Sequence, residues 1–352
     1  MRKKGLACVL TGMMTLSLAA CGSNTNNNNA GGTEESGATT NFSVAMVTDT
    51  GGVNDQSFNQ SSWGGLTALK DKYGVNVSYL ESVQEADYTT NLDKLIDQEN
   101  DLVWGVGFAI AQALESAAKM NPEQLFGIID HSYGDAIQDN VVCLTFRAQE
   151  ASFLVGYVAG LTTESDQVGF VGGIANDVLD QFEYGYRAGV AYAATELGKD
   201  ITVNVQYAES FNDAAKGKAI ATKMFSDGCD IVFHAAGNAG TGVIEAAKDA
   251  NKFAIGVDRD QYDLAPDNIL TSALKRVDQA VTLVSEKAMN GEEIGGEVFE
   301  LGLTENSVGL PEENPNMDPA VYEAAMKVQQ NIMDGAIDVP YNAETFAAFI
   351  AN

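Results

Sequence analysis

From Asn41 onward, short apolar runs rich in β-branched residues alternate with longer segments of helical periodicity. The cycle of strand, helix, strand, helix, strand, helix and strand occurs twice. It runs first from SVAMVTD to QLFGIID and then from QVGFVGG to KFAIGVD. This alternation is typical of βαβ units built around parallel sheets. The sequence therefore predicts an α/β fold with two similar lobes, each a doubly wound parallel sheet.

The chain does not stop after the second cycle. It continues through ILTSALKRV, a predicted helix to about Asn290, the strand-like EVFELGL and a last helix from about Pro319 to Asp334. These pieces most simply complete both lobes. One large doubly wound sheet is the alternative, but it would need an unusually wide parallel sheet.

If the additional pieces complete both lobes, the chain must pass between the lobes three times and form a three-strand hinge. We expect the crossings near Thr145, near Thr271 and near Gly302. Lobe 1 then consists of residues 41–145 with about 272–302, and lobe 2 of residues 146–271 with about 303–352.

The first 40 residues have a different composition from the rest. In residues 1–20, three basic residues precede an apolar stretch that ends in small residues, the layout of a secretory signal peptide. Residues 18–21, LAAC, resemble the bacterial lipobox, which predicts a lipid on Cys21. Residues 21–40 carry no large apolar side chain, so we expect a flexible tether. An ordinary signal peptide with a coincidental cysteine is the alternative.

No other apolar run is long enough to span a bilayer, so we expect attachment to the extracytoplasmic face of a bacterial membrane through the lipid alone. The formal charge of −29, less three positive charges on the signal peptide, becomes −32. Such a surface repels nucleic acid phosphates and excludes nucleic acid as a partner. We expect a monomer without a metal or cofactor. For Cys143 and Cys229, two buried free thiols are favoured over a disulfide.

Polar and aromatic residues gather where the predicted strands end. In open parallel sheets, ligands bind beyond the carboxyl ends of the strands. Single aspartates there commonly cap helices, but three in one cleft favour ligand recognition, because a carboxylate accepts from the paired hydroxyls of a sugar. The strand-end residues are Asp49, Gly107, Phe108, Asp130 and His131 in the first lobe, and His234 to Gly237 and Asp258 in the second.

The segment DTGGVNDQSFNQSSWGGL, which follows the first strand, is the most specific in the chain. Its paired glycines allow a tight turn. Ser57 and Gln60 predict a capping box at the start of a helix, which places Phe58 and Asn59 in the first turn, at the cleft. A core position is the alternative for Phe58, because Trp63 and the leucines after it already supply an apolar face.

This segment, together with SFND (210–213), AIGVDRDQ (254–261) and TSALKRVD (271–278), resembles the basic membrane protein family, of the purine nucleoside receptor type. The resemblance extends from Phe42 to the last helix and includes the lipobox. It implies the type I periplasmic binding protein fold, a purine nucleoside as ligand and an ABC permease in the membrane as partner, with no catalysis.

The resemblance also implies roles for individual residues. Phe58 and Phe211 would cover the two faces of the base, and Asn59 would bind its edge. Asp258 and Lys275 would hold the ribose hydroxyls. Further ligand contacts are expected from Asp49, Asp130 and Gly237, and Gly107, Phe108 and Phe182 are expected to line the cleft, with Phe182 a rival for the second aromatic face.

Other functional classes fit less well. A nucleoside hydrolase would place calcium-binding aspartates where this chain has Val47, Val53 and Asn54, which leaves too few carboxylates for the cation. GVGFAI and GNAGTG both fail the dinucleotide-binding pattern. A sensor or binding protein of the same fold for a sugar or signal molecule remains the alternative.

Overall fold

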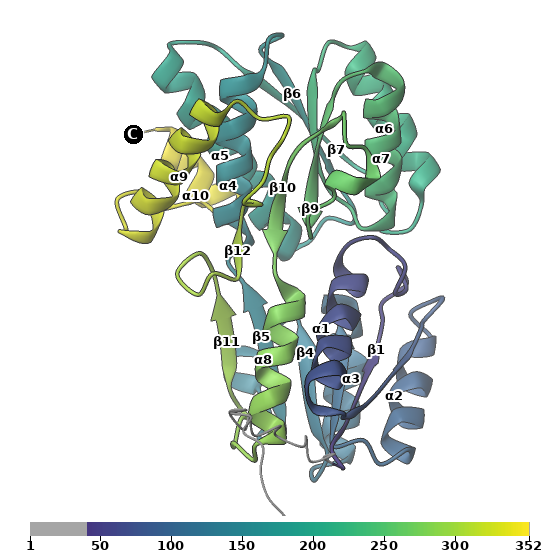
Figure 1. The fold of residues 1–352 in the computed structure, drawn as a ribbon. Helices are drawn as coiled ribbons and strands as arrows, with labels where there is room; N and C mark the ends of the chain where they lie inside the picture. The colour runs from purple at the N-terminus through teal and green to yellow at the C-terminus, as the bar shows by residue number, and fades with distance from the viewer. Residues whose placement is uncertain (1–40, 352) are drawn as a thin grey trace, which may run out of the picture. The chain divides into compact units, whose positions relative to one another are not determined.

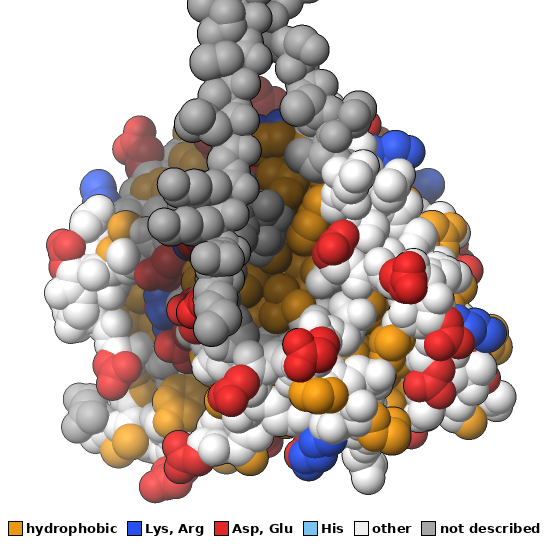
Figure 2. All heavy atoms as spheres, turned by 90° about the horizontal axis from the view of Figure 1, so that it is seen from below, with side chains coloured by type: hydrophobic (Ala, Val, Ile, Leu, Met, Phe, Trp, Pro, Cys, Tyr) orange, Lys and Arg blue, Asp and Glu red, His pale blue; other side chains and the backbone are white. Residues whose placement is uncertain are grey.

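The computed structural model describes residues 41–351. The predicted signal peptide, the predicted lipidation of Cys21 and the tether lie outside these residues. Residues 41–351 form two six-stranded sheets, each flanked by helices (Figure 1). Within this range, no helix is both long enough and apolar enough to cross a membrane. One face carries visibly more acidic than basic side chains (Figure 2), in keeping with the net charge.

The first sheet has the strand order β11-β5-β4-β3-β1-β2, and all its strands are parallel. Its central strands are apolar and almost fully buried, as expected for a sheet covered on both faces. The strands are β1 (Ser43–Val47), β2 (Asn76–Leu80), β3 (Leu102–Val106), β4 (Leu125–Ile129), β5 (Val141–Phe146) and β11 (Val298–Leu301). The helices of this lobe are α1 (Phe58–Tyr73), α2 (Asp87–Asp97), α3 (Ala111–Met120) and α8 (Val277–Met289).

The second sheet has the order β12-β10-β9-β8-β6-β7, in which only β12 is antiparallel to its neighbour. Its strands are β6 (Gln167–Gly172), β7 (Thr202–Tyr207), β8 (Ile231–Ala235), β9 (Phe253–Asp258), β10 (Ile269–Lys275) and β12 (Val308–Gly309). Its helices are α4 (Ala148–Thr162), α5 (Asp177–Leu197), α6 (Ala214–Ser226), α7 (Asn238–Ala250), α9 (Pro319–Met333) and α10 (Ala343–Ile350). The predicted fold class, two doubly wound parallel-sheet lobes, is confirmed.

The chain passes between the lobes after β5, after β10 and between β11 and β12. The second passage follows Lys275, four residues beyond Thr271, because β10 stays paired with β9 as far as Leu274 and with β12 at Lys275. Ionic contacts join the passages. The guanidinium of Arg147, just after β5, pairs with Glu305 on the third passage at 2.6 Å. The first and third passages are therefore held together by an ion pair.

Cys143 and Cys229 are both buried and both free. Cys143 lies in β5 of the first sheet, whereas Cys229 lies two residues before β8 of the second sheet. Burial raises the pKa of both thiols, so at neutral pH they stay protonated and pack as small apolar groups.

Candidate ligand-binding site

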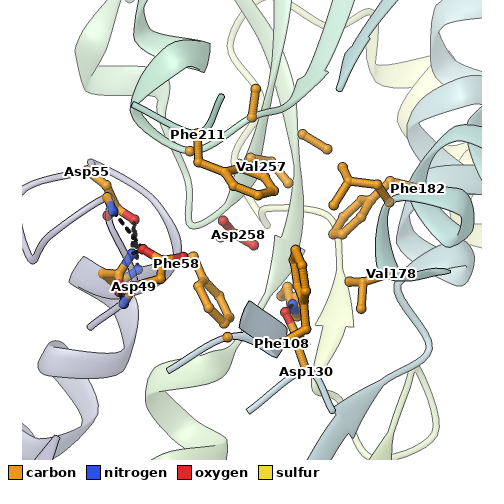
Figure 3. Close-up of a pocket in the computed structure, with 18 residues that line it drawn as sticks. Asp49, Asp55, Phe58, Phe108, Asp130, Val178, Phe182, Phe211, Val257 and Asp258 are labelled. Atoms are coloured by element: carbon orange, nitrogen blue, oxygen red, sulfur yellow. Dashed lines mark hydrogen bonds and ion pairs between the residues drawn. The ribbon is translucent and has the colours of Figure 1, made fainter. Parts of the chain in front are cut away.

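A cavity with about 570 Å³ of empty space lies between the carboxyl ends of the two sheets (Figure 3). Every residue that the sequence predicted as a ligand contact or as cleft lining contributes to its wall. These residues are Asp49, Phe58, Asn59, Gly107, Phe108 and Asp130 from the first lobe, and Phe182, Phe211, Gly237, Asp258 and Lys275 from the second.

The strand-end aspartates enter the cavity from both lobes. Asp49 follows β1, Asp130 follows β4, and Asp258 is the last residue of β9. Asp130 and Asp258 have positive φ angles of 63° and 65°. Asp tolerates this left-handed region better than most residues. The same backbone turn therefore ends an equivalent strand in each sheet and leaves a carboxylate at the cavity.

The start of α1 is capped by Asp55, and the predicted capping box of Ser57 and Gln60 is wrong. The Asp55 carboxylate accepts from the backbone N–H groups of Ser57 at 2.9 Å, Asn59 at 2.8 Å and Gln60 at 3.0 Å. Ser57 makes no side-chain cap because its hydroxyl donates to the carboxylate of Asp258 in the other lobe. Sequence reasoning missed Asp55, although a carboxylate two residues before the N-cap was a visible signal.

The amide of Asn59 is held entirely within the first lobe. Its Nδ2 donates to Asp49 Oδ1 at 2.8 Å and to Asp55 Oδ2 at 3.0 Å, and its Oδ1 accepts from the Asp49 N–H at 3.3 Å. Both donor hydrogens are thereby used. Asn59 orients Asp49, and its role at a base edge stays a prediction that involves only its carbonyl oxygen.

Asp49 keeps one oxygen toward the cavity. Its Oδ1 accepts from Gly51 N at 2.7 Å as well as from Asn59. Its Oδ2 and Phe58 Cε1 each lie 3.5 Å from the point where a side chain on Gly107 would begin. The free oxygen and the ring edge therefore face the same space. Burial, the largest cause, raises the pKa of Asp49 to about 6.

Lys275 is the cation of the cavity wall, and only 2% of it is exposed. Its ammonium pairs with the Asp130 carboxylate of the other lobe. It also lies 4.7 Å from the ring centre of Phe58, 5.0 Å from that of Phe146 and 5.8 Å from that of Phe182. Such contacts with aromatic rings offset part of the cost of burying the charge.

Asp258 faces the same cation but stays easily protonated. Burial raises its pKa to about 6, because the opposing effects of Lys275 and of the Ser57 hydroxyl are smaller. Ser57 occupies its Oδ2, so Oδ1 is the oxygen left for a ligand.

Aromatic rings face the cavity from both lobes (Figure 3). Phe58 begins α1, and Phe211 lies in the loop between β7 and α6. Phe108, in the short 3₁₀ helix Phe108–Ile110, packs edge-on against Phe211 with ring centres 6.2 Å apart. Phe211 packs directly against two glycines. A Cβ on Gly173 would lie 2.2 Å from the Phe211 ring, and a Cβ on Gly237 would lie 3.1 Å from the Phe211 carbonyl oxygen. Phe182 lies near Lys275.

The two histidines do not line this cavity. His234 is fully buried in β8, and neither ring nitrogen has a hydrogen-bond partner among residues 41–351. Burial lowers its pKa to about 4. The effect of Gln261 is in the opposite direction but smaller than that of burial. His234 is thus a neutral core residue.

The cavity combines four carboxyl groups with one ammonium, and it is rich in acceptors. Ionised carboxylates accept hydrogen bonds from hydroxyl and N–H groups, and they repel phosphates. Within residues 41–351, no cluster of three or more His, Cys, Asp or Glu side chains is arranged to hold a metal ion. The arrangement suits an uncharged ligand that carries hydrogen-bond donors and a flat apolar part.

A family model described as "ABC transporter substrate-binding protein PnrA-like" matches residues 42–343. The chain belongs to this family. Members of the PnrA-like family are substrate-binding proteins and not enzymes, work on the extracytoplasmic side, and serve an ABC permease as partner.

Individual relatives cover nearly the whole chain. A "CD4+ T-cell-stimulating antigen" of Listeria innocua is 40% identical over 97% of this chain and 99% of its own length. An "ABC transporter nucleoside-binding protein BmpA" of Lactococcus lactis is 38% identical over 86% of this chain and 90% of its own length. Among solved structures, a solute-binding protein of an ABC transporter system from Aeropyrum pernix superposes with a TM-score of 0.79 at 28% identity, over 88% of this chain and 96% of that one.

Proposed function

We propose that this PnrA-like protein binds purine nucleosides in the cavity between its lobes and delivers them to an ABC permease, while a lipid on Cys21 holds it at the membrane. The observation that supports the ligand class best is the pair of aromatic rings from opposite lobes, Phe58 and Phe211, beside strand-end carboxylates. A base stacked on an aromatic side chain gains about 1–3 kcal/mol per contact. The printed name of the Lactococcus lactis relative also points to nucleosides.

The other end of the cavity supports the proposal for the sugar. Asp258 offers its Oδ1, and Asp130 and Lys275 lie beside it. A carboxylate accepts from paired ribose hydroxyls, and an ammonium donates to them. The excess of carboxylates disfavours a 5′-phosphate, so the expected ligands are nucleosides and not nucleotides.

The contacts between the lobes suggest how binding is signalled. Lys275 pairs with Asp130, Ser57 with Asp258, and Gln261 Nε2 donates to the Gln56 carbonyl oxygen at 3.0 Å. In our proposal, the lobes rotate about the three crossings, the ligand docks on one lobe, and closure completes these contacts around it. The closed form is what the permease recognises.

A sugar or signal molecule is the second candidate, because the carboxylates at Asp130 and Asp258 suit any ligand with neighbouring hydroxyls. It makes less use of the aromatic rings, because a bare sugar has no planar π system to stack on Phe58 or Phe211.

Calorimetric titration of the chain from Gly22 onward tests the ligand class. We expect guanosine, adenosine and inosine to bind, and ribose and guanosine monophosphate to give no signal. Phe58→Ala weakens purine nucleoside binding by about 1–3 kcal/mol, which is roughly 5- to 150-fold. Phe346→Ala, on α10 outside the cavity, is the matched control and leaves affinity unchanged. Failure of every nucleoside to bind would reject the proposal and favour the sugar or signal molecule.

A further inference from the structure

The part of the cavity next to Phe58, which we call the Asp49 end, offers side-chain hydrogen-bond acceptors, and the one side-chain donor among the residues that line it is already used. The two N–H hydrogens of Asn59 are bound to Asp49 and Asp55. Asp49 Oδ2 has no hydrogen-bond partner among the described residues, and Gly107 keeps the space in front of it empty. The edge of a ligand placed here faces the lone pairs of Asp49 Oδ2, unless that oxygen carries a proton.

We propose that the protonation state of Asp49 selects the purine: the ionised carboxylate binds 6-oxopurine nucleosides, and the protonated carboxyl binds adenosine. This inference rests on the proposed function and adds to it a rule for choosing among bases. It assigns Asp49 as a specificity-determining residue and Asn59 as the residue that positions it.

The rule follows from the edges of the bases. In guanosine and inosine, N1 carries a hydrogen and donates to a carboxylate, and guanosine adds the donor on N2. In adenosine, N1 is an acceptor, so its lone pair would face the lone pairs of Asp49 Oδ2. A proton taken from solvent onto Oδ2 converts that repulsion into an O–H to N1 hydrogen bond. No covalent bond of the ligand changes.

The surroundings of Asp49 make the proton available near neutral pH. Burial raises the pKa of Asp49 to about 6, and the charges of Asp55 and Asp130 act in the same direction, whereas the hydrogen bonds from Gly51 and Asn59 lower it. Tyr88 on α2 also interacts with Asp49, Glu81 after β2 accepts from the Val53 N–H, and the Lys275 ammonium pairs with Asp130 across the cavity.

Proton linkage then gives opposite pH dependences. Above about pH 6, adenosine must bring a proton with it, so its affinity falls about tenfold per pH unit, while guanosine and inosine keep theirs. Below that pH, the 6-oxopurines weaken instead. Asp258 also titrates near pH 6, but it lies at the proposed ribose end and affects all these nucleosides alike. The ratio of guanosine to adenosine affinity therefore isolates Asp49.

The test uses the full chain, titrated with adenosine, guanosine and inosine from about pH 5 to 8, in two buffers of different ionisation enthalpy. We expect the guanosine to adenosine affinity ratio to rise by about tenfold per unit above pH 6, with about one proton taken up per adenosine and none per guanosine. Adenosine whose N1 is replaced by C–H has no acceptor there and should bind without proton uptake.

Asp49→Asn supplies a permanent donor, so the guanosine to adenosine affinity ratio should lose its pH dependence and guanosine should weaken. Asp135→Asn, which removes an exposed carboxylate from the same lobe, is the control and should change neither. If both nucleosides bind with a ratio that is constant in pH, the selection rule is wrong and the proposed function stands. If no purine nucleoside binds at any pH, the proposed function itself fails. The wild-type titration alone distinguishes these results. The selection rule can therefore be rejected even if the Asp49→Asn variant does not fold.

Discussion

The buried ion pair between the lobes gives a prediction whose size can be worked from the structure. The side chains of Lys275 and Asp130 are 3% and 9% exposed. Lys275→Met keeps the length and most of the packing of the side chain but leaves Asp130 and Asp258 without their cation. Removing one partner of a buried pair typically costs about 3–5 kcal/mol, because the remaining charge is uncompensated. We expect Lys275→Met to destabilise the fold by about that much.

A double-mutant cycle separates the pair from the loss of packing. Asp130→Asn removes the second charge, so the double variant should be destabilised by less than the sum of the single variants, with a coupling of about 2–3 kcal/mol. The measurement is urea unfolding without ligand at about pH 7.5, followed by circular dichroism. Lys199 and Asp166, an ion pair at 2.8 Å with both side chains 42% exposed, provide the control cycle. Their coupling should not exceed about 1 kcal/mol.

The stability of Lys275→Met should also depend on pH, in a direction that the pKa of Asp258 sets. Lys275 lowers the pKa of Asp258, which burial nevertheless raises to about 6. Without the ammonium, the pKa of Asp258 in the folded state rises further above its unfolded value. The folded state then binds more protons than the unfolded state, so the variant regains stability as pH falls through that pKa. Additive single effects, within about 0.5 kcal/mol, or a pH dependence equal to that of the wild type, would refute the reasoning.

Two further predictions concern the anchor and the core. Cys21→Ser should release the protein from the membrane fraction into the soluble one, whereas Cys8→Ser, inside the predicted signal peptide, should leave it attached; equal fractionation of both would reject lipidation of Cys21. His234 has a pKa of about 4 in the folded state and 6.5 unfolded, so the folded state loses about 3 kcal/mol of stability as pH falls from 6.5 to 4. His234→Leu should remove this loss, which urea unfolding across that pH range measures as a stability difference from wild type that grows toward low pH.

The strands and the position of the site followed from the sequence because they depend on local pattern and on one general rule. Apolar runs such as LVWGVG can be buried on both faces only in a parallel sheet covered by helices. Once the sheets are parallel, their carboxyl ends meet at one edge, and Asp49, Asp130 and Asp258 must lie near it. Their positions were therefore predictable without any knowledge of tertiary contacts.

The details that failed depend on partners distant in sequence. Ser57 has the local context of an N-cap, but its hydroxyl reaches Asp258, 201 residues later, and Asp55 caps the helix in its place. The sequence gives no sign that the Asn59 amide is engaged, yet both its N–H donors are bound to neighbouring carboxylates. A local pattern states which hydrogen bonds a side chain can make, and tertiary structure decides which of them it does make.

The ends of elements failed for a related reason. The crossing expected near Thr271 lies after Lys275, because β10 stays paired with β9 as far as Leu274 and with β12 at Lys275. Helix α10 was not predicted, since eight residues are too few for a clear period. It is fixed by a capping box between Asn342 and Thr345 and by Phe349, whose ring lies 5.9 Å from that of Phe153.

The same side chains bridge the lobes and line the cavity, so in the proposed function closure and ligand binding are linked. Lys275 and Asp130 bridge the lobes, as do Ser57 and Asp258, while all but Ser57 also face the ligand space. Closure without a ligand leaves the free oxygens of Asp49 and Asp258 in a poorly solvated cavity, which is costly while they are ionised. A ligand that donates to both oxygens removes this cost. In the proposed function, and while Asp49 is ionised, the acceptor-rich wall therefore favours closure around a molecule with donors at both ends, as a 6-oxopurine nucleoside has in its N1–H and its ribose hydroxyls.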